Sequence, residues 1–190
     1  MIVLTKKSFL VLFFCLLAGI LSVVIATHGA QKIMQVSATE KKIPIYCVEK
    51  QDKVISISFD AAWGNEQTTE LLNILDKYNV KTTFFVVGGW VDKYPESVKE
   101  IHDKGHEVCN HSDTHPHMVQ LSNQEKINQI KNCNKKIAAI TGKEPILFRP
   151  PYGDYNNEVV ETTNNLSMHC IQWDVDNMVT ETQRGHIKTN

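Results

Sequence analysis

The sequence lacks an excess of charge of either sign. Its 20 lysine and arginine residues nearly balance its 21 aspartate and glutamate residues, which leaves a formal net charge of -1. No basic run and no basic face stands out along the chain. Proteins that bind nucleic acids need such a surface, so we expect no nucleic-acid partner.

The sequence also lacks a CxxC motif and any Cys/His spacing typical of a structural zinc site. One of its five cysteines, Cys15, lies in the apolar N-terminal stretch. The other four allow three disulfide pairings, which the sequence leaves open. We favour small buried apolar residues as their role; they are Cys47, Cys109, Cys133 and Cys170.

The N-terminus carries the longest uncharged stretch of the chain, residues 8–26, which follows Lys6 and Lys7. At 1.5 Å per residue this stretch matches a hydrocarbon core of roughly 30 Å. Lysines on its N-terminal side predict a cytoplasmic N-terminus. We therefore predict that residues 1–30 form a single-pass cell-membrane anchor, with the rest of the chain on the extracytoplasmic side. The alternative is a signal segment and a secreted protein, since a passable cleavage site ends at Ala26.

The remaining chain reads as a spacer over residues 31–50 and a domain over residues 51–190. In the domain, short β-branched and apolar runs alternate with helical periods. Strict alternation predicts a parallel sheet with right-handed crossovers. The expected strands are 54–59, 82–87, 106–110, 146–149 and 168–173, and the expected helices are 68–78, 95–104, a helix opened by a Ser122/Glu125 capping box, and one through Val159 and Val160.

Polar residues follow most of these strands. Asp60 ends the first, His111 and His115 follow the third, Arg149 to Gly153 follow the fourth, and Trp173 to Asp176 end the fifth. Parallel α/β folds place their chemistry at the carboxyl ends of strands. Singly, each cluster is more typical of turns, caps or surface residues; together, on one rim, they indicate a catalytic site.

Metal-assisted hydrolysis is the chemistry that fits this rim. Closely spaced imidazoles such as His111 and His115 are good zinc ligands. A bound metal activates water and polarises a carbonyl, and Asp60 could take the proton of that water. Arg149 could pair with the Asp60 carboxylate, and backbone N–H groups of the loop around Tyr152 could stabilise an oxyanion.

The order Phe-Asp, His-Ser-x-x-His-Pro, Arg-Pro-Pro-Tyr-Gly and Trp-Asp-x-Asp resembles the polysaccharide deacetylases, or NodB-homology carbohydrate esterases, between about Val54 and Asp176. The resemblance implies a distorted (β/α) barrel that removes N-acetyl groups from amino sugars of cell-wall glycans such as peptidoglycan or chitin. It implies Asp60 as base, Arg149 as its orienting partner, Tyr152 in the oxyanion hole and Asp176 in support. The resemblance implies His111 and His115 as ligands of a divalent metal, with zinc as the expected ion. The Asp-Ala-Ala-Trp-Gly version of the first motif is most similar to a sporulation-associated branch.

The sequence departs from the family pattern in two places. Ala61 stands where the family has a second aspartate that binds the metal, so a metal site would be weakened. The fourth motif lacks its closing Asp-Trp, and the fifth, a Leu-x-His that carries the general acid, has no counterpart; His186 is not assigned to that role. We therefore expect a barrel truncated at its C-terminus. Alternatives to a deacetylase are an impaired or inactive remnant and a membrane-tethered glycan-binding protein.

Overall fold

The structure, a computed structural model, describes residues 6–36 and 40–175. The chain divides into two compact units, residues 1–41 and 42–190, which we describe separately. In the first unit, helix α1 (Lys6–Val36) contains a stretch, Lys7–Ile25, that is long and apolar enough to cross a membrane. Length and composition alone give this result, and a signal sequence has the same properties.

The second unit is built on a five-stranded parallel sheet in the order β1-β2-β3-β4-β5. The strands follow one another in space as they do in the chain, which is the arrangement of a (β/α) barrel. The predicted parallel α/β fold is confirmed. The strands are β1 (Ser58–Ala61), β2 (Thr83–Val86), β3 (Glu107–Asn110), β4 (Leu147–Phe148) and β5 (His169–Cys170).

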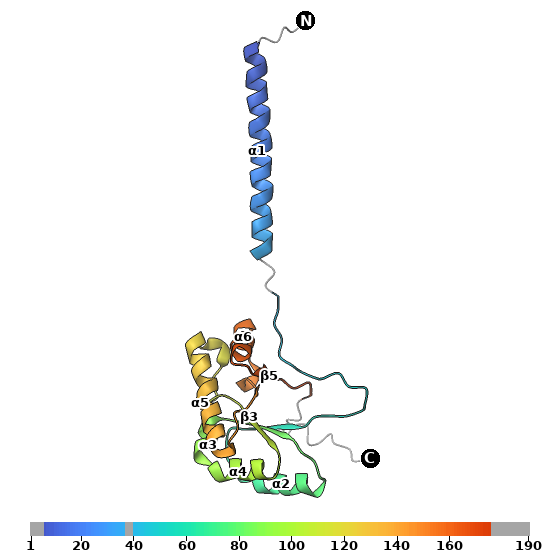
Figure 1. Cartoon of the computed structure of the whole chain (residues 1–190), viewed down its shortest axis with the longest axis vertical. Helices are drawn as coiled ribbons and strands as arrows, with labels where there is room; N and C mark the ends of the chain where they lie inside the picture. The colour runs from blue at the N-terminus through green and yellow to red at the C-terminus, as the bar shows by residue number, and fades with distance from the viewer. Residues whose placement is uncertain (1–5, 37–39, 176–190) are drawn as a thin grey trace, which may run out of the picture. The chain divides into compact units, whose positions relative to one another are not determined.

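Helices cover the outer side of this sheet (Figure 1). They are α2 (Thr68–Lys77), α3 (Gly88–Lys93), α4 (Pro95–Asp103), α5 (Asn123–Thr141) and α6 (Asn157–Asn165). Alternate residues of the strands, among them Phe84, Val86 and Val108, pack against these helices in one apolar cluster. A second cluster around Phe148 and Ile130 joins β4, α5 and α6. The residues between them in each strand therefore point to the opposite, inner face of the sheet.

Several elements differ from the sequence-based expectation. β4 and β5 are two residues long, whereas strands over 146–149 and 168–173 were expected. β1 begins at Ser58 instead of Val54, because Ser58 pairs with Thr83, the first residue of β2. Residues 54–57 run past the start of β2, so Val54 and Ile55 are exposed. Helix α3 was not predicted, because six residues are too few to show a helical period. In contrast, the capping box of Ser122 and Glu125 is present at the start of α5.

Part of the region that we predicted as a spacer lies against the domain. Ile45 forms an isolated parallel bridge with Ile171 and exchanges two backbone hydrogen bonds of 2.8 Å with Cys170 and Gln172. The Tyr46 hydroxyl lies 3.1 Å from that of Tyr155. This segment covers the outer edge of β5, and so shields backbone groups that an edge strand otherwise leaves unpaired.

Candidate active site

On the inner face of the sheet, an aspartate of β1 pairs with an arginine that follows β4. Asp60 of β1 and Phe85 of β2 are paired in register, and Arg149 follows β4. The Arg149 Nη1 group donates to Asp60 Oδ1 at 2.6 Å, and its Nη2 group donates to Ser58 Oγ at 2.7 Å. The guanidinium carbon lies 4.0 Å from the centre of the Phe85 ring. Arg149 is buried, and its planar head is thus fixed by two hydrogen bonds and a ring face.

His111 completes this cluster from the end of β3. Its Nδ1 atom lies 2.7 Å from the Arg149 carbonyl oxygen. A carbonyl oxygen only accepts, so Nδ1 carries the proton and the Nε2 lone pair is left available. Nε2 lies 3.8 Å from Asp60 Oδ2. Burial lowers the pKa of His111, with the Asp60 carboxylate acting in the opposite direction, so the ring is held neutral.

His115 lies beside His111 and faces two exposed aromatic rings. The ring centres of His115 and His111 are 5.0 Å apart, and those of His115 and Tyr152 are 4.6 Å apart. The Trp63 ring, 79% exposed, approaches His115 edge-on at 4.9 Å. Burial is also the largest cause that lowers the pKa of His115. The rim therefore presents a carboxylate and two neutral imidazoles between aromatic side chains.

The loop after β4 places Tyr152 in an unusual backbone conformation. Tyr152 has φ 59°, a left-handed geometry that costs a non-glycine residue free energy and is typical of functional sites. His117 stacks on the Tyr152 ring at 4.2 Å and pairs with Asp154 at 3.2 Å. The last residue of the expected site, Asp176, lies outside the described residues.

A divalent metal fits this rim only in part. Both imidazoles have the neutral form that a ligand needs, and the buried His115 Nδ1 atom has no hydrogen-bond partner among the described residues. Ala61, however, offers no donor atom, and its methyl group packs against the helix-side core. Catalytic zinc sites have three protein ligands. Within residues 6–36 and 40–175, no group of three His, Cys, Asp or Glu side chains could hold a metal ion. The residues present do not form a complete catalytic zinc site.

Sequence reasoning missed the residues that support the site from neighbouring elements. Ser58 and Phe85 hold Arg149, and Asp154 contacts His117. Ser58 lies two residues before Asp60 in β1. Phe85 lies opposite Asp60 in the neighbouring strand, β2. Because residues two apart share a face of a strand, the period-2 rule could have assigned Ser58 to the inner face. The contact of Phe85 depends on the register, which the sequence does not display.

Fold and rim together define an α/β protein of the barrel type with an Asp–Arg pair and two histidines at the carboxyl ends of its strands. A sequence profile of the family described as polysaccharide deacetylase matches residues 48–171. The chain belongs to the polysaccharide deacetylase family.

Similar proteins include one named as a deacetylase and one described as a pseudoenzyme. The peptidoglycan-N-acetylmuramic acid deacetylase PdaC of Bacillus subtilis is 39% identical over 68% of this chain and 27% of its own length. The crystal structure of wild-type BA3943 of Bacillus anthracis, described as a CE4 family pseudoenzyme, superposes with a TM-score of 0.68. It is 40% identical over 70% of this chain and 48% of that chain. A BA3943 mutant, 41% identical over 70% of this chain and 49% of that chain with the same TM-score, is described as having restored enzymatic activity. The chain spans about a quarter to a half of the length of these relatives.

Proposed function

We propose that this chain is a polysaccharide deacetylase that removes N-acetyl groups from amino sugars of a cell-wall glycan, with Asp60 as the base. The observation that carries the proposal is the cluster of Asp60, Arg149 and His111 on the inner rim. Family membership supports the reaction type, and the names of relatives such as PdaC support peptidoglycan as the substrate class.

We assign roles in this reaction to Asp60 and Arg149, whose contact leaves one carboxylate oxygen free. Arg149 engages Oδ1 of Asp60, which leaves Oδ2 to accept a proton from a water molecule that attacks the acetamide carbonyl. The Asp60 side chain is 34% exposed, so water can reach it. The proton held by Asp60 then passes to the amide nitrogen, the C–N bond breaks, and acetate and the free amine of the sugar are released with the Asp60 carboxylate restored. Backbone N–H groups around Tyr152 are the candidate donors to the transient oxyanion.

A second candidate function is glycan binding without turnover. It is favoured by Ala61, which removes a metal ligand from the family pattern, and by the likeness to BA3943, described as a pseudoenzyme. Exposed Trp63 and Tyr152 flank the rim and offer ring faces to a sugar chain in either function. The two candidates differ in one measurable product, which is acetate.

Three finer statements belong to this proposal. We assign α1 the role of a membrane anchor, with the domain on the extracytoplasmic side where cell-wall glycans lie, because its apolar stretch is long enough to span. His111 and His115 would bind a divalent cation such as zinc, weakly, through their neutral rings. A role in sporulation rests on the Asp60 to Gly64 sequence alone.

The test is acetate release by the full chain in detergent micelles from two substrates, an N-acetylated chitooligosaccharide and purified peptidoglycan. We expect acetate release from at least one of them. Equilibrium binding of each glycan is measured in parallel. Binding of either glycan without acetate would support the second candidate. A chain that neither binds nor deacetylates these glycans would contradict both.

A further inference from the structure

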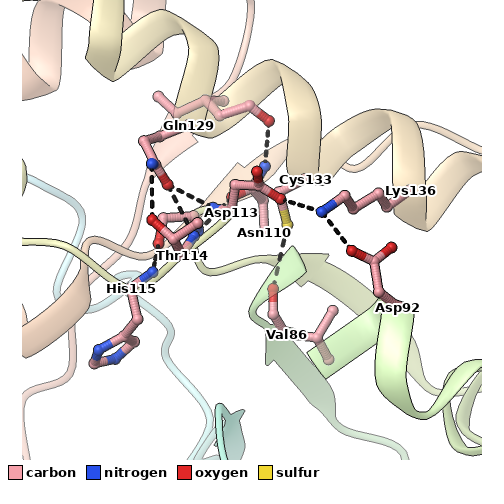
Figure 2. A network of polar contacts seen from close by, with 11 residues as sticks. Val86, Asp92, Asn110, Asp113, Thr114, His115, Gln129, Cys133 and Lys136 are labelled. Carbon is pink, nitrogen blue, oxygen red and sulfur yellow. Dashed lines mark hydrogen bonds and ion pairs between the residues drawn. The ribbon is translucent and has the colours of Figure 1, made fainter. Parts of the chain in front are cut away.

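We infer that Gln129 of α5 is a positioning residue for the candidate active site, because it fixes the loop that carries His115. The effect that we expect on kcat rests on the proposed function. The displacement of His115 that we expect rests on the geometry alone. Gln129 lies outside every sequence motif of the rim and does not touch the reacting groups. Figure 2 shows its side chain reaching from α5 to the loop between His111 and His115.

Gln129 makes three hydrogen bonds to this loop, all with good geometry. Its Oε1 atom accepts from the backbone N–H groups of Asp113 and Thr114, each at 2.9 Å. Its Nε2 group donates to Thr114 Oγ1, also at 2.9 Å. One half-buried carboxamide therefore uses both of its polar atoms on two consecutive residues of the loop (Figure 2).

The opposite side of the loop is held by the first two residues of α3. The N–H groups of Gly88 and Gly89 donate to the carbonyl oxygens of Ser112 and Asp113, each at 2.9 Å. A Cβ atom at Gly88 would lie 2.1 Å from Asp113 Oδ1, so only glycine allows this approach. Lys136 of α5 donates to the same Asp113 oxygen at 2.6 Å (Figure 2).

The loop needs this support because its backbone is strained. Ser112 has φ 68° and His115 has φ 60°, and neither is glycine. Such conformations persist only where the surroundings over-determine them. His115 N–H donates to Ser112 Oγ at 3.0 Å, so the two strained residues hold each other, and Gln129 holds the two residues between them.

The two histidines depend on this support to different degrees. The His111 ring is fixed directly, by its 2.7 Å hydrogen bond to the Arg149 carbonyl oxygen. The His115 Nδ1 atom has no hydrogen-bond partner among the described residues, so its ring position follows from the backbone of the loop and from ring contacts. Removal of Gln129 should therefore displace His115 and leave His111 in place.

The experiment compares four forms of the full chain in detergent micelles: wild type, Gln129→Leu, Gln129→Glu and Gln124→Leu. Gln124 is the matched control, since it lies on the same helix and is exposed, and among the described residues its side chain donates to Asn128 Oδ1 at 3.0 Å. Ring signals of isotopically labelled histidines are recorded by NMR. Thermal unfolding, kcat and KM for acetate release are measured on the same samples.

For Gln129→Leu we expect the His115 ring signals to shift while those of His111 stay. We expect kcat to fall by about 10- to 100-fold, the scale of a small misplacement of a catalytic group, with KM changed by less than about twofold. Gln129→Glu should stay near wild type, because its carboxylate can accept from both N–H groups and from the Thr114 hydroxyl. Gln124→Leu should match wild type throughout.

Unchanged His115 signals in Gln129→Leu would overturn the inference, as would a Gln129→Glu form that behaves like Gln129→Leu. If Gln129→Leu does not fold, Thr114→Val is used instead, because it removes one of the three hydrogen bonds. It should shift the ring signals of His115 and not those of His111, by a smaller amount than Gln129→Leu would. Unshifted His115 signals in Thr114→Val would also overturn the inference. A wild-type chain that releases no acetate contradicts the proposed function only, because the His115 signals still decide the positioning role.

Discussion

The two arms of the candidate site are built differently. The first arm, residues 60–64, begins with the last two residues of β1, which pairs with β2 alone among the described strands. Its aspartate is held by one partner, Arg149. The second arm, residues 110–115, begins with the last residue of β3 in the middle of the sheet and is bonded by α5 on one side and by the start of α3 on the other.

The departure from the family pattern falls in the first arm, which has fewer supporting contacts than the second. Ala61 lies there, beside Asp60, and adjacent residues of a strand point to opposite faces. Its methyl group packs with Phe59 against the helix-side core, away from Arg149. The second arm keeps both histidines in a heavily bonded loop. The comparison teaches that Asp60 depends on one hydrogen-bond partner, Arg149, whereas the loop that carries the histidines is held by a network.

Apart from loss of the base itself, the largest expected effect is on the Asp60–Arg149 pair of the first arm. Arg149→Met removes the 2.6 Å bond to Asp60 and the 2.7 Å bond to Ser58. We expect kcat for acetate release to fall by about 100-fold, because the base loses its fixed orientation. Arg149→Lys keeps the charge but not the forked geometry, so its kcat should lie between those of wild type and Arg149→Met. Equal rates for Arg149→Met and wild type would show that Asp60 needs no such partner.

The second arm should retain metal affinity in spite of Ala61. Titration of Co²⁺ into the full chain should show weak binding, and His111→Ala or His115→Ala should weaken it by at least about tenfold, since loss of supporting groups alone has effects of that size. His169→Ala serves as the control, because His169 is exposed and lies on β5. Binding that is the same in all four proteins would place any metal elsewhere.

Buried imidazoles at both ends of β3 predict a dependence of stability on pH. Burial lowers the pKa of His106 and of His111, so the unfolded chain binds protons before the folded one as the pH falls. Stability conferred by the neutral rings is therefore complete above the unfolded pKa of about 6.5 and declines below it, by at most about 1.4 kcal/mol per pH unit for each proton. Urea unfolding at several pH values between 5 and 8 measures this. A stability that rises as the pH falls from 6.5 would refute the assignment.

The smallest expected effect concerns the exposed ring of the first arm. Trp63→Ala should weaken binding of a chitooligosaccharide by about two- to tenfold, the change that loss of one aromatic contact of roughly 0.5–1.4 kcal/mol gives. Tyr78, 66% exposed at the C-terminal cap of α2, supplies the control in Tyr78→Ala. If the two variants bind equally well, Trp63 has no part in glycan binding.

The sequence predicts the rim because parallel folds bring strand ends together, and Asp60, His111 and Arg149 each follow a strand. It predicts α5 because the capping box is local, encoded by Ser122 and Glu125. It does not predict Gln129, whose role depends on where α5 crosses the loop. Nor does it predict the bounds of β1, which runs from Ser58 to Ala61 and not over 54–59, because these bounds follow from the register with β2.

The most direct measurement is acetate release by the wild-type chain and by Asp60→Asn, with Asp103→Asn as the matched control. Asp103 is exposed on α4 and pairs only locally with Lys99, at 2.5 Å. The account predicts that Asp60→Asn lowers the rate by about 100- to 10,000-fold, the contribution of a positioned base, while Asp103→Asn equals wild type. An Asp60→Asn chain that releases acetate at the wild-type rate would contradict the central claim.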